Sequence, residues 1–260
     1  MLLKFVSTIV VLLLLIYIAG AFALYAVQRR MLYVPSPEYA HEFDRLELQN
    51  QQETLNVVVL NSGQSQAIIY FGGNAESAVF NAEPFLKNFP GHTIYLVNYR
   101  GYGGSSGLPT ELGLYSDSLA LYDQVRASHE SISLIGRSLG SGVATYLASE
   151  RQVSYLALIT PYDSIKNVAQ AHIPIYPIGL LIKDKYDSIE KAVRVSAPVL
   201  IVMAELDSVI PNSHSIKLSE SFKKEQVSII NIKGAHHNNL SIDPVYYRSL
   251  KRFFSSTFKL

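Results

Sequence analysis

The hydrophobic pattern of this sequence consists of short apolar runs separated by segments with helical periodicity. The runs are rich in Val, Ile, Leu and Tyr, and they lie at 67–71, 93–99, 131–135, 154–160, 198–203 and 227–232, with two more within 46–60. Helical patterns lie at 111–128, 143–149, 183–193, 213–222 and 244–254. Apolar runs without alternation are typical of strands buried on both faces of a parallel sheet. The pattern therefore predicts one α/β domain on a mostly parallel, doubly wound sheet.

A much longer apolar segment lies at the N-terminus. Phe5 to Val27 carries no charge, and at about 1.5 Å per residue a helix of this length spans roughly 30 Å of hydrocarbon. The alternative is a cleaved signal peptide, with Lys4 before the apolar run and Ala21-Phe22-Ala23 as the cleavage site. Because the run is longer than a usual signal-peptide core and Arg29-Arg30 follows it directly, we expect an uncleaved, single-pass membrane anchor. The charges on its two sides nearly balance, so the membrane side of the remaining chain stays open.

Three parts follow from this pattern. We expect the anchor at residues 1–28, a linker with Pro35 and Pro37 at 29–44, and the folded domain at 45–260. The net charge is +1 at pH 7, which gives no indication of a nucleic-acid partner. The sequence contains no cysteine, which excludes disulfides, thiol catalysis and zinc–thiolate sites. No His or carboxylate cluster has metal-ligand spacing, so we expect neither a metal nor an organic cofactor.

A short motif follows directly on the apolar run at 131–135. Residues 136–140 read Gly-Arg-Ser-Leu-Gly, and a helical pattern of small residues comes next. G-x-S-x-G between a strand and a helix is typical of a nucleophile elbow. The turn is tight, so Gly136 and Gly140 are predicted to sit where there is almost no space for a side chain. This context predicts that Ser138 presents its hydroxyl at the end of a strand, as a nucleophile.

Two groups suited to assist this serine follow the last two apolar runs. Asp207 comes after the run at 198–203, and His236-His237 comes after the run at 227–232. Because the carboxyl ends of parallel strands meet at one edge of a sheet, these side chains are expected to lie near Ser138. A histidine can accept the serine proton, and a carboxylate can orient the imidazole. Spacing leaves Glu205 and Asp187 as other candidates for the acid, and it does not choose between the two histidines.

An acyl-transfer site also needs two backbone N–H groups directed at the developing oxyanion. The residue after the nucleophile, Leu139, is expected to supply one. The other is expected from the loop after the run at 67–71, where Gly72-Gly73 lets the backbone approach closely. Asn74 is the candidate for this second amide.

Taken together, these residues resemble the α/β-hydrolase superfamily, and within it the membrane-anchored α/β-hydrolase domain-containing proteins and their serine-aminopeptidase-like relatives. The resemblance covers 30–254 and rests on six motifs in order, at 70–76, 98–107, 136–142, 160–164, 207–211 and 234–239. It implies Ser138 as nucleophile, Asp207 as acid and His237 as base, since relatives commonly have glycine before the base. Two positions depart from the family pattern: Gly72 stands where relatives usually have histidine, and Ala204 where they usually have glycine.

The resemblance implies a serine hydrolase that acts through an acyl-enzyme on esters, thioesters or peptides. The apolar segment 173–182, with Pro174 and Pro177, lies where hydrolases of this fold carry a short helical lid. The alternative interpretation of this segment is a pair of helices that only covers the sheet. The anchor and this segment together indicate a small-molecule or lipid acyl substrate. Two other interpretations of the function stay open: a serine peptidase of the same fold, and a catalytically inactive binding protein.

Overall fold

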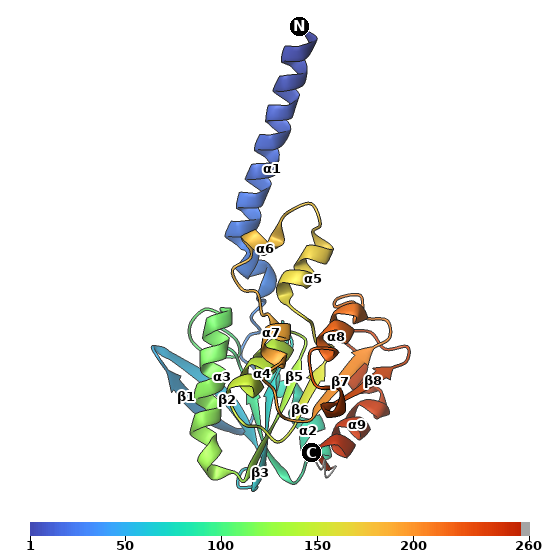
Figure 1. Ribbon diagram of the computed structural model, residues 1–260. Helices are drawn as coiled ribbons and strands as arrows, with labels where there is room; N and C mark the ends of the chain where they lie inside the picture. Colours follow the sequence, from blue (N-terminus) through green and yellow to red (C-terminus); the bar gives the residue numbers. More distant parts are fainter. Residues whose placement is uncertain (256–260) are drawn as a thin grey trace.

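The computed structural model describes residues 1–255 and contains an eight-stranded sheet with the order β1-β2-β4-β3-β5-β6-β7-β8 (Figure 1). The strands β3 to β8 pair in parallel, whereas β1 and β2 pair antiparallel at one edge. Their bounds are β1 Asp44–Asn50, β2 Glu53–Leu60, β3 Gln66–Phe71, β4 His92–Val97, β5 Ser131–Arg137, β6 Leu156–Ile159, β7 Val199–Ala204 and β8 Val227–Ile232. The predicted mostly parallel sheet is confirmed.

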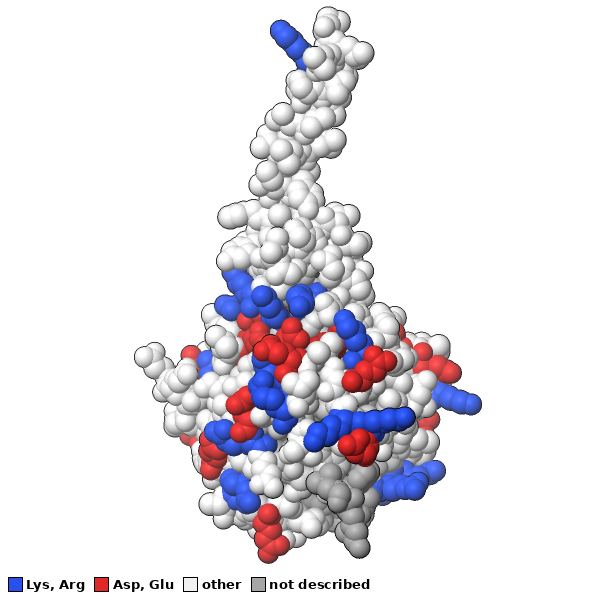
Figure 2. Space-filling view, viewed as in Figure 1, with Lys and Arg blue, Asp and Glu red and all other residues white. Residues whose placement is uncertain are grey.

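The helix α1 (Leu2–Leu32) projects from the domain and carries the N-terminus far from the sheet (Figure 1). It runs past the expected anchor boundary at residue 28, and the chain from Tyr33 to Phe43 has no regular helix or strand. Figure 2 shows charged side chains over the domain and at the tip of α1, with none along the helix between them. This distribution follows the uncharged stretch of the sequence.

Helices cover both faces of the sheet because successive strand residues point to opposite sides. In β3, Ala67, Ile69 and Phe71 face one hydrophobic core, and Ile68 and Tyr70 face the other. The first core is covered by α3 (Glu111–Val125), α4 (Leu139–Glu150), α7 (Ser188–Ala192) and α8 (Asn212–Ser219). The second core is covered by α2 (Ala82–Asn88) and α9 (Pro244–Ser255).

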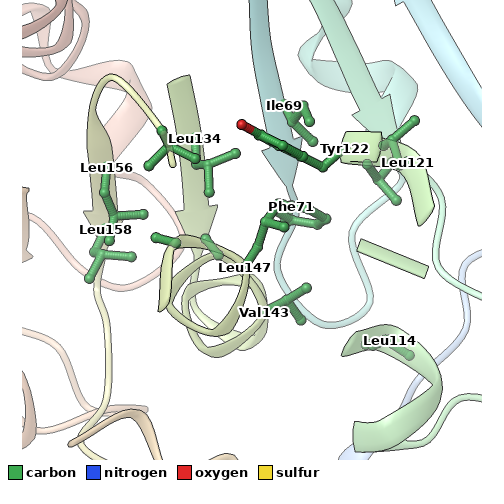
Figure 3. Packing of buried hydrophobic residues seen from close by; sticks show 14 of the residues in the cluster. Ile69, Phe71, Leu114, Leu121, Tyr122, Leu134, Val143, Leu147, Leu156 and Leu158 are labelled. Atoms are coloured by element: carbon green, nitrogen blue, oxygen red, sulfur yellow. The ribbon is translucent and has the colours of Figure 1, made fainter. Parts of the chain in front are cut away.

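The helix α4 is held firmly at the centre of the first core. Its Val143 and Leu147 pack with Phe71 of β3 and Leu134 of β5, and all four side chains are almost completely buried (Figure 3). Dense packing of this kind fixes the helix against the strands. Since α4 begins directly after Ser138, the packing also fixes the residue predicted to be the nucleophile.

A helical insertion, residues 164–187, connects β6 to α7. It contains α5 (Ile165–His172) and α6 (Ile178–Leu181), which lie beside the C-terminal part of α1 (Figure 1). The helix expected over 183–193 is shorter than its pattern suggested, since only Ser188–Ala192 is helical. The residues before α7 make other interactions: the Asp184 carboxylate pairs with Arg29, and the Asp187 side chain caps the N-terminus of α7.

Candidate active site

Ser138 lies at a sharp turn between the last residue of β5 and the first residue of α4. Its backbone angles are φ 49° and ψ −116°, a strained conformation for a residue with a side chain. Strain of this type is characteristic of a nucleophile elbow, where the turn lifts the serine hydroxyl above the end of the strand.

The two glycines around Ser138 occupy positions with no room for a side chain. A Cβ atom on Gly136 would lie 2.7 Å from the Ala144 Cβ, and one on Gly140 would collide with the carbonyl of Phe71. Cβ atoms do not approach other atoms this closely without a shift of the backbone. The prediction that the turn requires glycine at both positions is confirmed.

The structure brings Ser138, His237 and Asp207 into one hydrogen-bonded row, although they come from three separate loops. The Nε2 atom of His237 lies 2.9 Å from the Ser138 Oγ, and its Nδ1 atom lies 2.7 Å from the Asp207 Oδ2. The other carboxylate oxygen of Asp207 accepts hydrogen bonds from the backbone N–H groups of Val209 (2.9 Å) and Ile210 (2.8 Å). The Asp207 side chain is fully shielded and the His237 side chain is 8% exposed.

The other candidates for acid and base lie outside this row. His236 is exposed, and its Nδ1 faces the backbone oxygen of Leu206 at 3.2 Å. Glu205 accepts a hydrogen bond from the N–H of Gly234 at 2.8 Å. Asp187 lies at the N-terminus of α7, where its nearest cation is Lys166 at 3.6 Å. The geometry therefore singles out His237 and Asp207 as the residues that can act on Ser138.

The loop after β3 lies beside Ser138, as expected for an oxyanion loop. A Cβ atom on Gly73 would be 3.7 Å from the Ser138 Cβ. The Asn74 side chain accepts hydrogen bonds from the Val34 N–H and the Tyr102 hydroxyl, both at 2.9 Å. Within residues 1–255, neither the backbone N–H of Asn74 nor that of Leu139 donates a hydrogen bond to a protein acceptor. Both amides are thus available to a ligand oxygen.

Glu76 and Arg137 form an ion pair beneath these loops that the sequence did not predict. The Arg137 Nη1 lies 2.7 Å from the Glu76 Oε2, and the Arg137 Nη2 donates to the backbone oxygen of His237 at 3.2 Å. Glu76 also accepts hydrogen bonds from the Gly73 N–H (2.8 Å) and the Tyr70 hydroxyl (2.5 Å). Burial alone would lower the pKa of the Arg137 guanidinium, but Glu76 raises this pKa above its ordinary value. The pair connects the loops of Ser138, His237 and Asn74.

Replacing Glu76 by glutamine should therefore weaken both the fold and the site. We expect the free energy of unfolding to fall by roughly 2–4 kcal/mol, because Arg137 is left partly buried without its counter-charge. Since small displacements of reacting groups are costly, kcat should fall roughly ten- to a hundredfold. Urea denaturation measures the first effect and steady-state turnover measures the second. Glu83→Gln on the exposed side of α2 is the matched control, and equal behaviour of the two variants would contradict this role.

A second carboxylate–imidazole pair lies after β6 and was also missed. The buried Asp163 carboxylate lies 2.8 Å from the His214 Nδ1 and 2.6 Å from the Asn167 Nδ2. Burial would raise the pKa of Asp163, but these hydrogen bonds outweigh it and lower the pKa. Because Asn167 belongs to α5 and His214 to α8, the pair fastens the helical insertion to the domain. Asp163 and His214 are 51 residues apart in the chain, which leaves no local signal in the sequence.

No metal site is apparent in the part of the chain that the structure describes. No three His, Asp or Glu side chains among residues 1–255 lie in an arrangement that could hold a metal ion. The candidate site consists of a serine, its hydrogen-bonded imidazole and carboxylate, and two backbone amides. These groups suit nucleophilic attack on a carbonyl carbon.

Comparisons with known proteins agree with this architecture. Residues 66–171 match the sequence profile of the α/β hydrolase fold. An uncharacterized protein of Mycobacterium tuberculosis is 30% identical over 204 residues, which cover 76% of this chain and 72% of that protein. The alpha/beta hydrolase domain-containing protein 17C of Xenopus tropicalis is 33% identical over 168 residues, which cover 62% of this chain and 52% of that protein.

Solved structures show the same fold. The esterase Pf2001 of Pyrococcus furiosus superimposes with a TM-score of 0.67 at 17% identity, over 85% of this chain and 98% of that chain. The sheet order, the sharp turn at Ser138 and the related sequences lead to one conclusion. This chain belongs to the α/β-hydrolase superfamily.

Proposed function

We propose that this protein is a serine hydrolase that cleaves acyl ester or thioester bonds through an acyl-enzyme on Ser138. The observation that carries the proposal is the row of hydrogen bonds from Ser138 through His237 to Asp207, at 2.9 and 2.7 Å. An isolated serine hydroxyl is a weak nucleophile, so it needs a base that removes its proton during attack. The row supplies this base and a carboxylate that orients it.

The chemistry follows from these positions. The Ser138 Oγ attacks the carbonyl carbon of the substrate while its proton passes to the Nε2 of His237. The Asp207 carboxylate stabilises the resulting imidazolium, and the N–H groups of Leu139 and Asn74 donate to the oxyanion. When the tetrahedral intermediate collapses, His237 returns the proton to the leaving alcohol or thiol. His237 then deprotonates a water molecule, which attacks the acyl-enzyme carbonyl carbon. When this second intermediate collapses, the bond to the Ser138 Oγ breaks, His237 returns its proton to Oγ, and the carboxylic acid leaves.

We further propose that α1 anchors the enzyme in a membrane. Among the described helices, α1 is long and apolar enough to cross a bilayer, and the mean hydropathy of its most apolar 18-residue window is 2.7. Its contacts with the helical insertion favour an anchor over a cleaved signal peptide. Cleavage after Ala23 would remove Tyr17, whose ring stacks on Tyr176 and whose hydroxyl donates to the backbone oxygen of Ile175 at 2.9 Å. Arg29 and Arg30 then mark the level of the lipid headgroups.

Covalent labelling tests the proposed function directly. The full-length protein in detergent is treated with an alkyl fluorophosphonate, and mass spectrometry locates the modified residue. We expect one phosphonyl group on Ser138 and none on the neighbouring Ser141, which is buried and donates to the backbone oxygen of Ser138. Heat-unfolded protein is the control and should not react. Folded protein that remains unlabelled would favour an inactive binding protein, whereas labelling on a different serine would contradict the role of Ser138 as nucleophile.

A further inference from the structure

A cavity of about 240 Å³ lies between α1 and the helical insertion, on the membrane side of the domain. Apolar cavities of about 150 Å³ already stay dry and bind a molecule such as benzene. The cavity has one wall from the anchor helix and one from the insertion, formed mainly by aliphatic side chains that include Leu24, Leu32, Val168, Ala169, Ile178 and Leu181. Its shape thus depends on the anchor as much as on the domain.

The polar groups at this cavity are already occupied by protein partners. The Gln28 amide donates to the backbone oxygen of Leu181 at 3.0 Å and accepts from the N–H of Lys183 at 2.6 Å. The Asp184 carboxylate is held by Arg29 and by the N–H of Glu111. A ligand of this cavity therefore finds no unsatisfied hydrogen-bonding group, which favours a purely apolar ligand.

The insertion runs along α1 in a fixed register. Asp184 pairs with Arg29, the Leu181 carbonyl accepts from Gln28, and the Tyr176 ring stacks on Tyr17 with 4.8 Å between ring centroids. From Arg29 to Tyr17 the helix rises by roughly 18 Å. With Arg29 at the level of the lipid headgroups, the tip of the insertion lies near the middle of the hydrocarbon core, which is about 30 Å thick.

The tip of the insertion is suited to this depth. Residues 173–182 carry no charge, and Ile175 and Leu180 are 69% and 86% exposed. Backbone groups in lipid need partners within the protein. Gln170 supplies two of them, since its amide donates to the Tyr176 carbonyl at 3.0 Å and accepts from the Ile178 N–H at 3.0 Å. The Tyr17 hydroxyl donates to the Ile175 carbonyl at 2.9 Å.

Both walls of the cavity continue to the loops of the candidate active site. The chain leaving α1 contacts the oxyanion loop, where the Val34 N–H donates to the Asn74 side chain at 2.9 Å. At the other side, the end of α5 contacts the loop of the candidate acid, with the His172 Nε2 3.2 Å from the Val209 carbonyl. The residues that line the cavity do not include Ser138, His237 or Asn74, so these two connections are what relate the cavity to the candidate active site.

We infer that this cavity binds the acyl chain of a membrane-resident substrate, with α1 as one wall of the substrate site. The inference rests on the proposed function and names its substrate class: long-chain acyl esters or thioesters whose chain enters sideways from the leaflet. At the depth of Leu24, above Arg29, the surrounding apolar molecules are lipid acyl chains. The anchor would thus select substrate as well as hold the enzyme at the membrane.

Chain-length selectivity tests the two walls with matched substitutions. The full-length protein is placed in phosphatidylcholine nanodiscs, and kcat/KM is measured for p-nitrophenyl butyrate and palmitate. Ala169→Trp and Leu24→Trp fill the cavity from α5 and from α1, and each should lower the palmitate-to-butyrate ratio at least roughly tenfold, the effect of about two excluded methylene groups. Ala171→Trp and Ala26→Trp, at exposed positions of the same helices, should leave the ratio near that of the wild type.

A photoreactive probe gives a readout that does not depend on folding of a variant. A fluorophosphonate with a long alkyl chain and a terminal diazirine is allowed to react with wild-type protein in nanodiscs, and the mixture is irradiated. We expect crosslinks within α1 residues 20–32 and α5. Labelled Ser138 with crosslinks only elsewhere, or an unchanged ratio in both cavity variants, would overturn the acyl-chain site alone. Absent labelling of Ser138 would overturn the proposed function itself.

Discussion

Replacing Ser138 by alanine should lower kcat for p-nitrophenyl butyrate by roughly 10⁴- to 10⁶-fold, and His237→Ala should have an effect of similar size. Without the hydroxyl no acyl-enzyme forms, and without the imidazole the hydroxyl keeps its proton. Because the two groups act as a unit, the double variant should be scarcely worse than either single variant. Steady-state turnover and the rate of fluorophosphonate labelling both report the loss.

The matched control is His236→Ala, which changes the neighbouring histidine in the same loop. His236 is exposed and faces the Leu206 carbonyl rather than Ser138, so its removal should change kcat less than about threefold, as for other surface changes. Activity that survives in His237→Ala and disappears in His236→Ala would transfer the role of base to His236 and contradict the assignment.

Much of the fold and the position of Ser138 in the candidate site were predictable, because the sequence patterns that indicate them involve residues close together in the chain. The strand, the turn and the helix around Ser138 occupy adjacent residues, so the motif and its context could be read together. Asp207 was the expected acid because it follows a buried strand, but Glu205 follows the same strand, so position alone left the acid open. The choice between His236 and His237 did not follow from spacing, since it depends on how the loop turns after β8, where Gly234 has φ +66°. The structure directs one ring toward Ser138 and the other toward solvent.

The features that the sequence could not predict all join distant residues. Arg29 and Asp184 are 155 positions apart, and Arg137 reaches the carbonyl of His237 across 100 positions. Periodicity and motif spacing report on neighbours in the chain, so they carry no information about such pairs. The apolar segment 173–182 was expected either as part of a lid or as a helix pair that covers the sheet, and its sequence did not indicate that α1 would pack against it. The acyl-chain cavity arises only from that contact.

Replacing Asp207 by asparagine should lower kcat by about 10⁴-fold while leaving the fold intact. The reason lies in the three hydrogen bonds of the carboxylate. One oxygen accepts from the N–H groups of Val209 and Ile210, and the other faces the His237 Nδ1. In asparagine the amide oxygen must keep the two backbone donors, so its NH₂ group faces Nδ1. Nδ1 then becomes an acceptor, the ring proton moves to Nε2, and Nε2 no longer accepts the proton of Ser138.

Because the ring proton changes its position, the Asp207→Asn variant has a distinctive signature. Asp207→Asn should keep the melting temperature and the KM of the wild type within a small margin, because size and backbone contacts are preserved, whereas kcat and the labelling rate of Ser138 fall together. Nitrogen NMR of the His237 ring would report the proton on Nε2. Asp187→Asn is the matched control, since asparagine also serves as an N-cap for α7 and should leave kcat unaltered. A loss below about tenfold in Asp207→Asn would mean that another group orients the imidazole, and the acid would then have to be sought among the remaining carboxylates.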